Sequence, residues 1–415
     1  MHSQSRRSFL STVGALSAVN LSHGGWLDAH GGAPVLQPAK ARGLAAADDF
    51  QFAPGLVYLQ TGSLGPTPRP VMNAAFAAWK ELELNPVHYA FGPHEQAMET
   101  VRSKAAALVG CKMEEMLVTR STTEGMNWTA QGLGLKAGDR VLTTDQEHPG
   151  GRVCWDYLVR KHGVAIDVVP IPAGENDAQA IVDRFAKALT PRTRVLSFSH
   201  LLTSTGLRMP VKELSALARK QGAVSVVDGA QAVGGVAVDV KALGCDVYVT
   251  SAHKWLLAPP GSGLLYLNDA LAGAVDPLPL QSGRAVYSAS SGVTNIPGVL
   301  ALGTAIDYVT TIGIAAIERH NMALRERVWQ ALQSVPRIRV VSPGAGPLAS
   351  PLVTFGLPDA VKSADLYQRL SDNHKVVVKV VPGNWMNGTR ISTHLFNTND
   401  DVDALIAALK AELAG

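Results

Sequence analysis

The sequence of 415 residues has little cysteine and few of the motifs that mark metal or nucleotide sites. Its three cysteines, Cys111, Cys154 and Cys245, form no CxxC pair, which excludes a disulfide framework and a cysteine-rich zinc site. No HExxH or comparable histidine spacing indicates a metal, and the motifs GxxxxGK(S/T) and GxSxG are absent. We therefore expect neither a metal centre, a P-loop nor a hydrolase nucleophile.

An excess of charge and long apolar runs are also lacking. The 37 lysine and arginine residues nearly balance the 34 aspartate and glutamate residues, leaving a formal net charge of +3. No basic cluster interleaves with aromatic residues, so nucleic-acid binding is not expected. No run of about 18 apolar residues is present, and we expect no membrane insertion. With 47% hydrophobic and 17% charged residues, the composition is typical of a folded globular protein.

The N-terminal segment contains two adjacent arginines. Arg6 and Arg7 lie in the run SRRSFL, ahead of a mildly apolar stretch over residues 11–21, and the first acidic residue is Asp28. This pattern resembles a twin-arginine export signal, and such signals carry proteins that are already folded. We interpret residues 1–45 as a signal peptide and linker, and expect a periplasmic protein exported by the twin-arginine machinery. The alternative is an ordinary basic N-terminal segment.

The body of the chain alternates short apolar stretches with helical stretches. This alternation predicts an α/β fold with a mainly parallel sheet covered by helices on both faces. In such sheets ligands bind at the carboxyl ends of the strands. The expected strands are 116–120, 140–144, 164–169, 193–199, 223–228, 246–251 and 263–267.

The pattern changes after residue 304. A long helical stretch over 305–332 leads into a smaller αβ region. We interpret 46–304 as a large ligand-binding domain and 305–415 as a small C-terminal domain, on which the N-terminal segment of the large domain can pack. The expected elements of the small domain are strands at 338–342, 352–355 and 376–381 and a closing helix at 401–413.

Two neighbouring strand ends carry a carboxylate and an amine. One strand ends at Asp228, and 254 − 228 = 26 residues later Lys254 follows the next strand in the run SAHKW. A lysine at the ligand-binding edge can form a Schiff base, and a buried aspartate can keep a pyridine nitrogen protonated. Pyridoxal phosphate is the cofactor that needs both groups. The alternatives are a solvated loop lysine and an aspartate that only forms a turn.

Two further strand ends offer groups suited to a flat, phosphorylated ligand. Thr122 and Thr123 follow Ser121, which is spaced from Glu124 as in a capping box, so they open a helix whose N-terminus can bind a phosphate. His148 follows the strand 140–144, and its ring can stack on a planar cofactor. The alternatives are a helix cap without a ligand and a solvated loop histidine.

Several stretches resemble the class V aminotransferase group of fold-type I pyridoxal phosphate enzymes. They are DGAQ followed by SAHKW, RSTTEGMN, DQEHPGG and TRISTHLFNT. The stretch YLQTGSLGPTPRPV is similar to the isopenicillin N epimerase-like branch of that group, and the resemblance covers about residues 50–410. Together with the export signal, it resembles periplasmic members that tailor siderophore peptides such as pyoverdine.

This resemblance implies a role for each matching residue. Lys254 would bind the cofactor covalently, Asp228 would contact its pyridine nitrogen and His148 would stack on its ring. Arg390 would clamp the substrate carboxylate, unless it pairs with a surface acid. Gln231 would lie near the phenolic oxygen with Thr203, where the family commonly has asparagine. The groups expected to bind the phosphate are Thr122, Thr123, Ser251 and His253, with Thr294 reaching it from the partner subunit of a homodimer.

The sequence therefore predicts a pyridoxal phosphate enzyme that acts at the α-carbon of an amino acid or exported peptide. Transamination and epimerisation are both open, and lyase or oxidase chemistry on the same scaffold is the alternative. A nicotinamide oxidoreductase is disfavoured because GxGxxG is missing after a first strand, and a non-catalytic binding protein because Lys254, Asp228 and His148 occur together. Cysteine desulfurases of the group carry a catalytic cysteine in their C-terminal part. No cysteine follows Lys254 here, so we expect no desulfurase.

If Arg6 and Arg7 direct export, replacing both by lysine should leave the folded enzyme in the cytoplasm with its cofactor already bound. The change keeps the charge and removes only the arginine identity, and Arg42→Lys in the linker is the matched control. Cell fractionation and the cofactor absorbance of each fraction measure the outcome. Unchanged periplasmic enzyme in the double variant would contradict the export signal.

Overall fold

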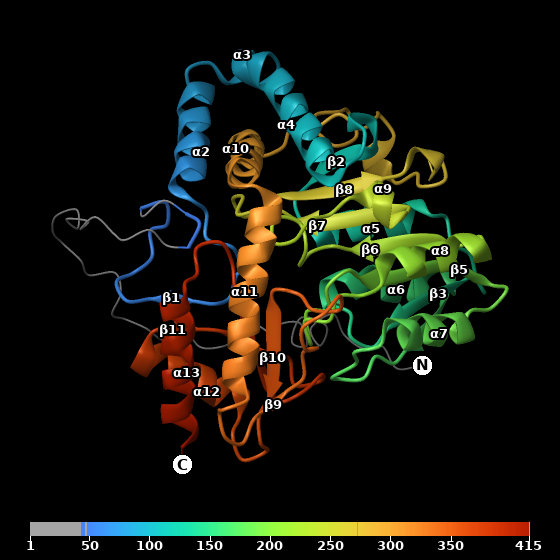
Figure 1. Ribbon diagram of the computed structural model, residues 1–415. Coiled ribbons are helices and arrows are strands. Elements are labelled where there is room, and N and C mark those ends of the chain that lie inside the picture. The colour runs from blue at the N-terminus through green and yellow to red at the C-terminus, as the bar shows by residue number, and fades with distance from the viewer. Residues whose placement is uncertain (1–42, 46–47, 272, 415) are drawn as a thin grey trace, which may run out of the picture. The chain divides into compact units, whose positions relative to one another are not determined.

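The computed structural model describes residues 43–45, 48–271 and 273–414 (Figure 1). The predicted export signal, with Arg6 and Arg7, lies outside the described residues. Within the described part of the chain, the strands form sheets of seven, four and two strands.

The seven-stranded sheet confirms the predicted α/β fold. Its strand order is β2-β8-β7-β6-β5-β3-β4. Strand β8 is antiparallel to both neighbours and the other pairs are parallel, so the sheet is mostly parallel. Every residue of β7 is buried, as expected for a sheet covered on both faces. The strands are β2 (Met116–Thr119), β3 (Arg140–Thr144), β4 (Ala165–Val169), β5 (Thr193–Ser199), β6 (Val224–Asp228), β7 (Val247–Ser251) and β8 (Gly263–Leu267).

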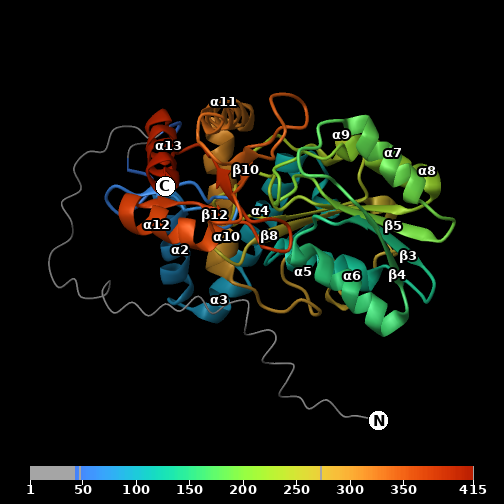
Figure 2. The same cartoon turned by 90° about the horizontal axis from the view of Figure 1, so that it is seen from below.

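Helices cover both faces of this sheet (Figure 2). Helices α5 (Thr122–Gly132) and α6 (Pro149–His162) pack on one face, where Trp155 is fully buried. The other face is covered by α7 (Ala178–Ala188), α8 (Val211–Gln221) and the short α9 (Val240–Leu243). The crossovers put both helix N-termini and strand carboxyl ends at one edge of the sheet, which is where a ligand site forms.

The four-stranded sheet is antiparallel and has its own apolar core. Its order is β12-β13-β10-β9, and helices α11, α12 and α13 contribute apolar side chains to that core. The N-terminal strand β1 (Val57–Tyr58) pairs with β11 (Val376–Val377), and Ser392 N then donates to Leu59 O. The elements are β9 (Arg339–Val340), β10 (Leu352–Gly356), β12 (Lys379–Val380), β13 (Gly388–Ser392), α11 (Ile314–Leu332), α12 (Ser363–His374) and α13 (Asn399–Leu413).

The helical stretch expected over 305–332 is divided between two helices. Helix α10 (Ile296–Ile312) ends at Gly313, whose φ of 93° suits glycine, and α11 leaves at an angle of 74°. Among the described residues no single helix is long and apolar enough to cross a membrane, and the bent pair α10–α11 meets that test only when joined. Helix α10 packs against α2 (Arg69–Leu82) and α4 (Pro93–Val109), and the short helix α3 (Pro86–Ala90) lies between α2 and α4 in the chain. The short 3₁₀ turns are Met113–Glu115, Asp269–Leu271 and Leu278–Leu280.

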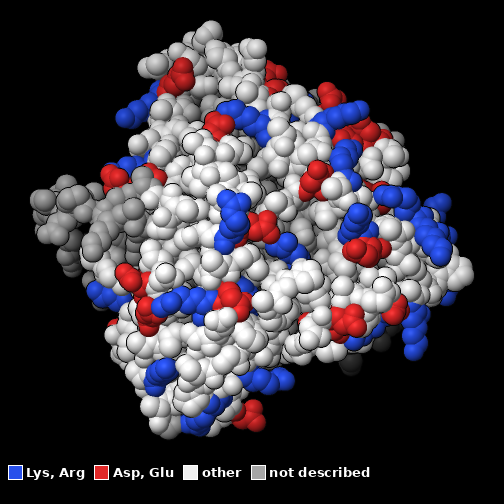
Figure 3. Space-filling model, viewed as in Figure 1, with Lys and Arg blue, Asp and Glu red and all other residues white. Residues whose placement is uncertain are grey.

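Charges of both signs are intermixed on the outer surface. On the face shown in Figure 3, lysine and arginine side chains lie among aspartate and glutamate side chains. Ion pairs among the described residues include Lys104 Nζ with Asp307 Oδ2 at 2.6 Å and Arg327 Nη2 with Asp403 Oδ1 at 2.5 Å.

Candidate active site

A cavity of about 340 Å³ lies at the carboxyl ends of the central strands. The strands β5, β6 and β7 end there in Ser199, Asp228 and Ser251, and the small sheet closes it from β12 and β13. Every residue predicted for the site lines this cavity except Thr294. They are Lys254, Asp228, His148, Gln231, Thr122, Thr123, Thr203, Ser251, His253 and Arg390.

Lys254 is held in a tight loop after β7. Its backbone carbonyl lies so close to Gly65 that a Cβ on that glycine would come within 1.9 Å of the oxygen. Burial lowers the pKa of Lys254 to about 8; the Asp228 carboxylate opposes the shift, and the cations of Arg390 and Lys379 add to it. At pH 7 about a tenth of the molecules therefore carry the neutral amine, the form that acts as a nucleophile or base.

Asp228 points one carboxylate oxygen toward the cavity. Its Oδ1 accepts a hydrogen bond from Ala230 N at 2.9 Å, which orients the group. Its Oδ2 faces Gly151, where a Cβ would come within 2.6 Å, so only glycine leaves that side open. Burial raises the pKa of Asp228, against the opposing effects of the Ala230 amide and Lys254. This oxygen suits a ligand N–H.

The N-terminus of α5 forms a polar cradle. Ser121 caps the helix by accepting from Glu124 N at 3.2 Å. Ser251 Oγ accepts from Thr122 N at 2.9 Å and lies 2.9 Å from Thr122 Oγ1. Thr123 and His253 line the same part of the chain's cavity. Helix amides and hydroxyls in this arrangement attract an anion such as a phosphate.

His148 caps α6 with its ring. Its Nδ1 accepts from Gly150 N at 3.0 Å, so in the neutral ring Nε2 carries the proton. Desolvation, together with the cations of Lys254, Lys379 and Arg390, lowers the pKa of His148 to about 4. The ring is thus neutral at pH 7, oriented by its own helix, and able to stack on a flat ligand.

Gln231, Thr203 and Arg390 are connected by hydrogen bonds. Gln231 Nε2 donates to Gly62 O at 2.8 Å and to Thr203 Oγ1 at 3.4 Å, while its Oε1 accepts from Trp255 Nε1 at 2.9 Å. Arg390 Nη1 donates to the carbonyl and hydroxyl oxygens of Thr203. Thr203 Oγ1 accepts twice, so its own proton remains to be donated into the cavity, whereas the Gln231 amide is already engaged.

The Arg390 guanidinium is buried without an acid. The residue is 1% exposed, and its Nε and Nη2 have no hydrogen-bond partner within the described structure. Burial lowers its pKa to about 10. A buried, half-satisfied guanidinium is costly unless an anion binds it, and its fork fits a carboxylate. The alternative of pairing with a surface acid does not hold, because Thr203 is its partner.

Thr294 is not brought to the cavity within one chain. It lines a separate hollow with Gly292, Val293 and the α5 residues Glu124 and Trp128. Its predicted approach from a partner subunit remains a prediction.

Sequence reasoning missed three residues near the site. Lys379 and Trp385 line the cavity, and Lys379 is the one charged residue of the apolar run 376–381, a signal that could have been noticed. Glu147 accepts from Thr144 Oγ1 and Ser199 Oγ, each at 2.6 Å, and burial raises its pKa to about 7. Its position directly before His148 is a weak signal, since it does not reveal burial.

Residues 57–405 of the chain match the class-V aminotransferase family. The chain belongs to this family. Isopenicillin N epimerase from Amycolatopsis lactamdurans is 29% identical over 88% of this chain and 97% of its own. A cysteine desulfurase from Salmonella agona is 31% identical over 85% and 92%. The two kinds of relative are about equally similar, so likeness alone does not separate their chemistries.

A solved structure supports the fold. The mutant K223A of C-DES, with glycine covalently linked to its pyridoxal phosphate cofactor, has a TM-score of 0.78 and 22% identity over 86% of this chain and 97% of that chain. The cofactor of this class-V enzyme is pyridoxal 5′-phosphate. The cavity fits it, because the hydroxyl-rich N-terminus of α5, one oxygen of Asp228 and the buried amine of Lys254 all line it.

Because the pKa of Lys254 is about 8, the apoenzyme should bind pyridoxal phosphate covalently faster as the pH rises, with a midpoint near 8. The neutral amine attacks the carbonyl, and its fraction grows through the pKa. Asp228→Asn should lower the midpoint and Arg390→Gln should raise it, since the first removes an anion and the second a cation. Borohydride trapping followed by mass spectrometry measures the rate, with N-acetyl-lysine, of pKa about 10.4, as control. A midpoint equal to that of the control would contradict the burial argument.

Proposed function

We propose that this enzyme acts at the α-carbon of an amino acid, free or within an exported peptide, by transamination or epimerisation. One observation carries the proposal: the unpaired guanidinium of Arg390 shares a cavity with the amine of Lys254 and with Asp228. A carboxylate bound by Arg390 brings the α-carbon of the same molecule into that cavity. Tailoring of a siderophore peptide in the periplasm is the finer form of the proposal, supported by the resemblance of the N-terminal run to an export signal.

Lys254 has two successive roles in this proposal. Bound pyridoxal phosphate supplies an electron sink for the pair left on the α-carbon when its proton leaves. Lys254 would hold the cofactor until the substrate amine takes its place, and its freed Nζ would then remove the α-proton as a base. Return of that proton to the cofactor would begin transamination, which water completes by releasing the keto product and a second substrate by accepting the amino group. Protonation of the α-carbon on its opposite face would give epimerisation and requires a proton donor on that face.

The other residues would hold and orient the cofactor. Asp228 Oδ2 would accept the N–H of the cofactor ring and keep that nitrogen protonated, while Oδ1 accepts from Ala230 N. Neutral His148 would cover one face of the ring and exclude water from it. Thr203 would donate its hydroxyl proton to the phenolic oxygen. The groups that would bind the phosphate at the α5 N-terminus are Thr122, Thr123, Ser251 and His253.

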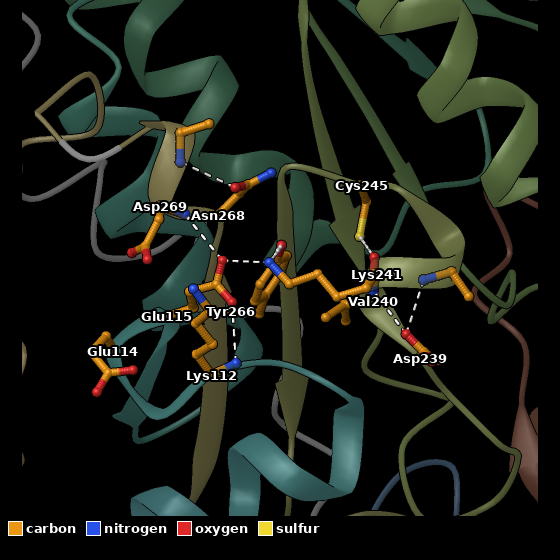
Figure 4. Close-up of polar contacts among 12 residues, drawn as sticks. Lys112, Glu114, Glu115, Asp239, Val240, Lys241, Cys245, Tyr266, Asn268 and Asp269 are labelled. Carbon is orange, nitrogen blue, oxygen red and sulfur yellow. Dashed lines mark hydrogen bonds and ion pairs between the residues drawn. The ribbon is translucent and has the colours of Figure 1, made fainter.

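The positions of the cysteines support a reaction other than desulfuration. Cys245 Sγ lies 3.8 Å from Val240 O, beside the Lys241–Glu115 ion pair (Figure 4). Cys154 is buried in α6, and burial raises the pKa values of Cys111, Cys154 and Cys245 to about 12 each. None of the three lines the cavity with Lys254. A desulfurase needs a thiolate that can reach the substrate sulfur.

The holoenzyme in D₂O should incorporate deuterium at the α-carbon of its substrate, as mass spectrometry of candidate amino acids and peptides would reveal. Lys254→Ala should lower this exchange by about 10²- to 10⁴-fold, whereas Lys187→Ala, on the exposed face of α7, should not change it. L-cysteine should give no persulfide, and a triple Cys→Ser variant should keep its exchange. Sulfide release that the triple variant loses would instead assign the enzyme to the desulfurases.

We also propose that the enzyme is a homodimer. Three large apolar side chains, Trp79, Val87 and Val293, are 58%, 70% and 63% exposed and line one hollow with Thr294. An exposed apolar cluster of this kind marks an interaction surface. A second copy packed on it would bury these side chains and carry Thr294 toward the neighbouring subunit.

Trp79→Glu combined with Val87→Glu should shift the dimer toward monomer, because burying two carboxylates in an apolar interface is unfavourable. Val168→Glu, which changes an exposed apolar residue of edge strand β4, is the matched control. Sedimentation velocity distinguishes the species. A monomeric wild-type enzyme at micromolar concentration would contradict the proposal.

A further inference from the structure

Two cations lie opposite each other at the cavity wall. Lys379 of β12 is the Cα partner of Arg390 of β13 in the antiparallel pairing of these strands. Both side chains line the cavity, Arg390 fully buried and Lys379 half-buried. Like charges directly opposite on neighbouring strands destabilise a sheet. Their pairing therefore has a cost that the fold alone does not explain.

No acidic group of the described structure offsets this cost. Arg390 is bonded to Thr203, and Lys379 has neither a hydrogen bond nor an ion pair among the described residues. Asp228 is the one acidic residue lining the cavity, and it faces Lys254. On the outer surface, Lys104 and Arg327 each have a carboxylate partner.

The environment of Lys379 favours binding an anion. Burial lowers its pKa, and Arg390 lowers it further. Its cavity neighbours Val381, Pro382 and Trp385 are largely apolar, which strengthens attraction between a lysine and an incoming negative charge. An anionic ligand group would relieve both the burial and the repulsion.

The two cations suit different anionic groups. Arg390 presents two unpaired nitrogens, and a guanidinium fork binds both oxygens of one carboxylate. Lys379 is a point charge on a flexible stem and is free for a second group. Resting on the function proposed above, we propose that Lys379 binds a second carboxylate, so that the preferred substrate is an α-amino acid with an acidic side chain.

The experiment compares ligands that differ by one charge. The holoenzyme is titrated with L-glutamate against L-glutamine and with L-aspartate against L-asparagine, and binding is followed by the cofactor absorbance. Glutarate against its monoamide, followed by thermal shift, gives the same comparison without reaction. We expect the acid of at least one amino acid pair, and glutarate, to bind about tenfold more tightly than the amide.

Variants assign this preference to one residue. Lys379→Met should weaken binding of the acid about tenfold and change binding of the amide much less. Lys379→Arg should retain the preference, and Lys410→Met, at an exposed position of α13, should have no effect. Arg390→Lys should weaken binding of the acid and of the amide of each pair to the same extent. Circular dichroism and cofactor content show that each variant is folded and loaded.

Three results would overturn the inference. The wild type would bind acid and amide equally well, or bind neither. Lys379→Met would weaken binding of the acid and of the amide equally, or that variant would lose its cofactor, which would place Lys379 on the phosphate. If any of these results overturned the inference, deuterium exchange at the α-carbon by the wild type would still support the proposed function. An enzyme without cofactor, or without exchange on any amino compound, would instead remove the proposed function.

Discussion

The buried side chain of Trp255 holds the reactive loop between the two sheets. Its indole nitrogen donates to Gln231 Oε1 at 2.9 Å, and its carbonyl oxygen lies 2.8 Å from His394 Nε2. Gln231 follows β6 of the large sheet, and His394 follows β13 of the small one. The neighbouring Lys254 is therefore positioned by both sheets at once. Leu257, fully buried with a φ of 60°, keeps the same loop in a strained, left-handed turn that its burial must stabilise.

Close packing around this loop depends on small residues. A Cβ on Gly235 would come within 2.6 Å of the Trp255 ring, and one on Gly234 within 2.4 Å of its carbonyl oxygen. Asn321 of α11 donates to Gly235 O at 2.9 Å and lies 3.3 Å from His394 Nδ1. The contact between the sheets is thus a continuous buried network, and the cavity is formed at its edge.

Within that frame, charge determines what the cavity can bind. Lys254 interacts electrostatically with Asp228, whereas Lys379 and Arg390 have no acidic partner among the described residues and line the same cavity. At the α5 N-terminus, backbone amides and hydroxyl groups rather than side-chain cations form a cradle suited to a phosphate. The epimerase and desulfurase relatives match this chain almost equally, so this similarity alone does not distinguish the reactions.

The sequence by itself determined the α/β fold, the strand ends and the gathering of Asp228, Lys254, His148 and Thr122, because carboxyl ends of parallel strands meet at one edge whatever the details of packing. The tertiary structure decided the features that no local sequence pattern predicts. The register of β12 against β13 sets Lys379 beside Arg390, and burial sets the pKa values of Lys254 and Glu147. Long-range pairing and desolvation depend on residues far apart in the chain, so one strand read alone does not reveal them.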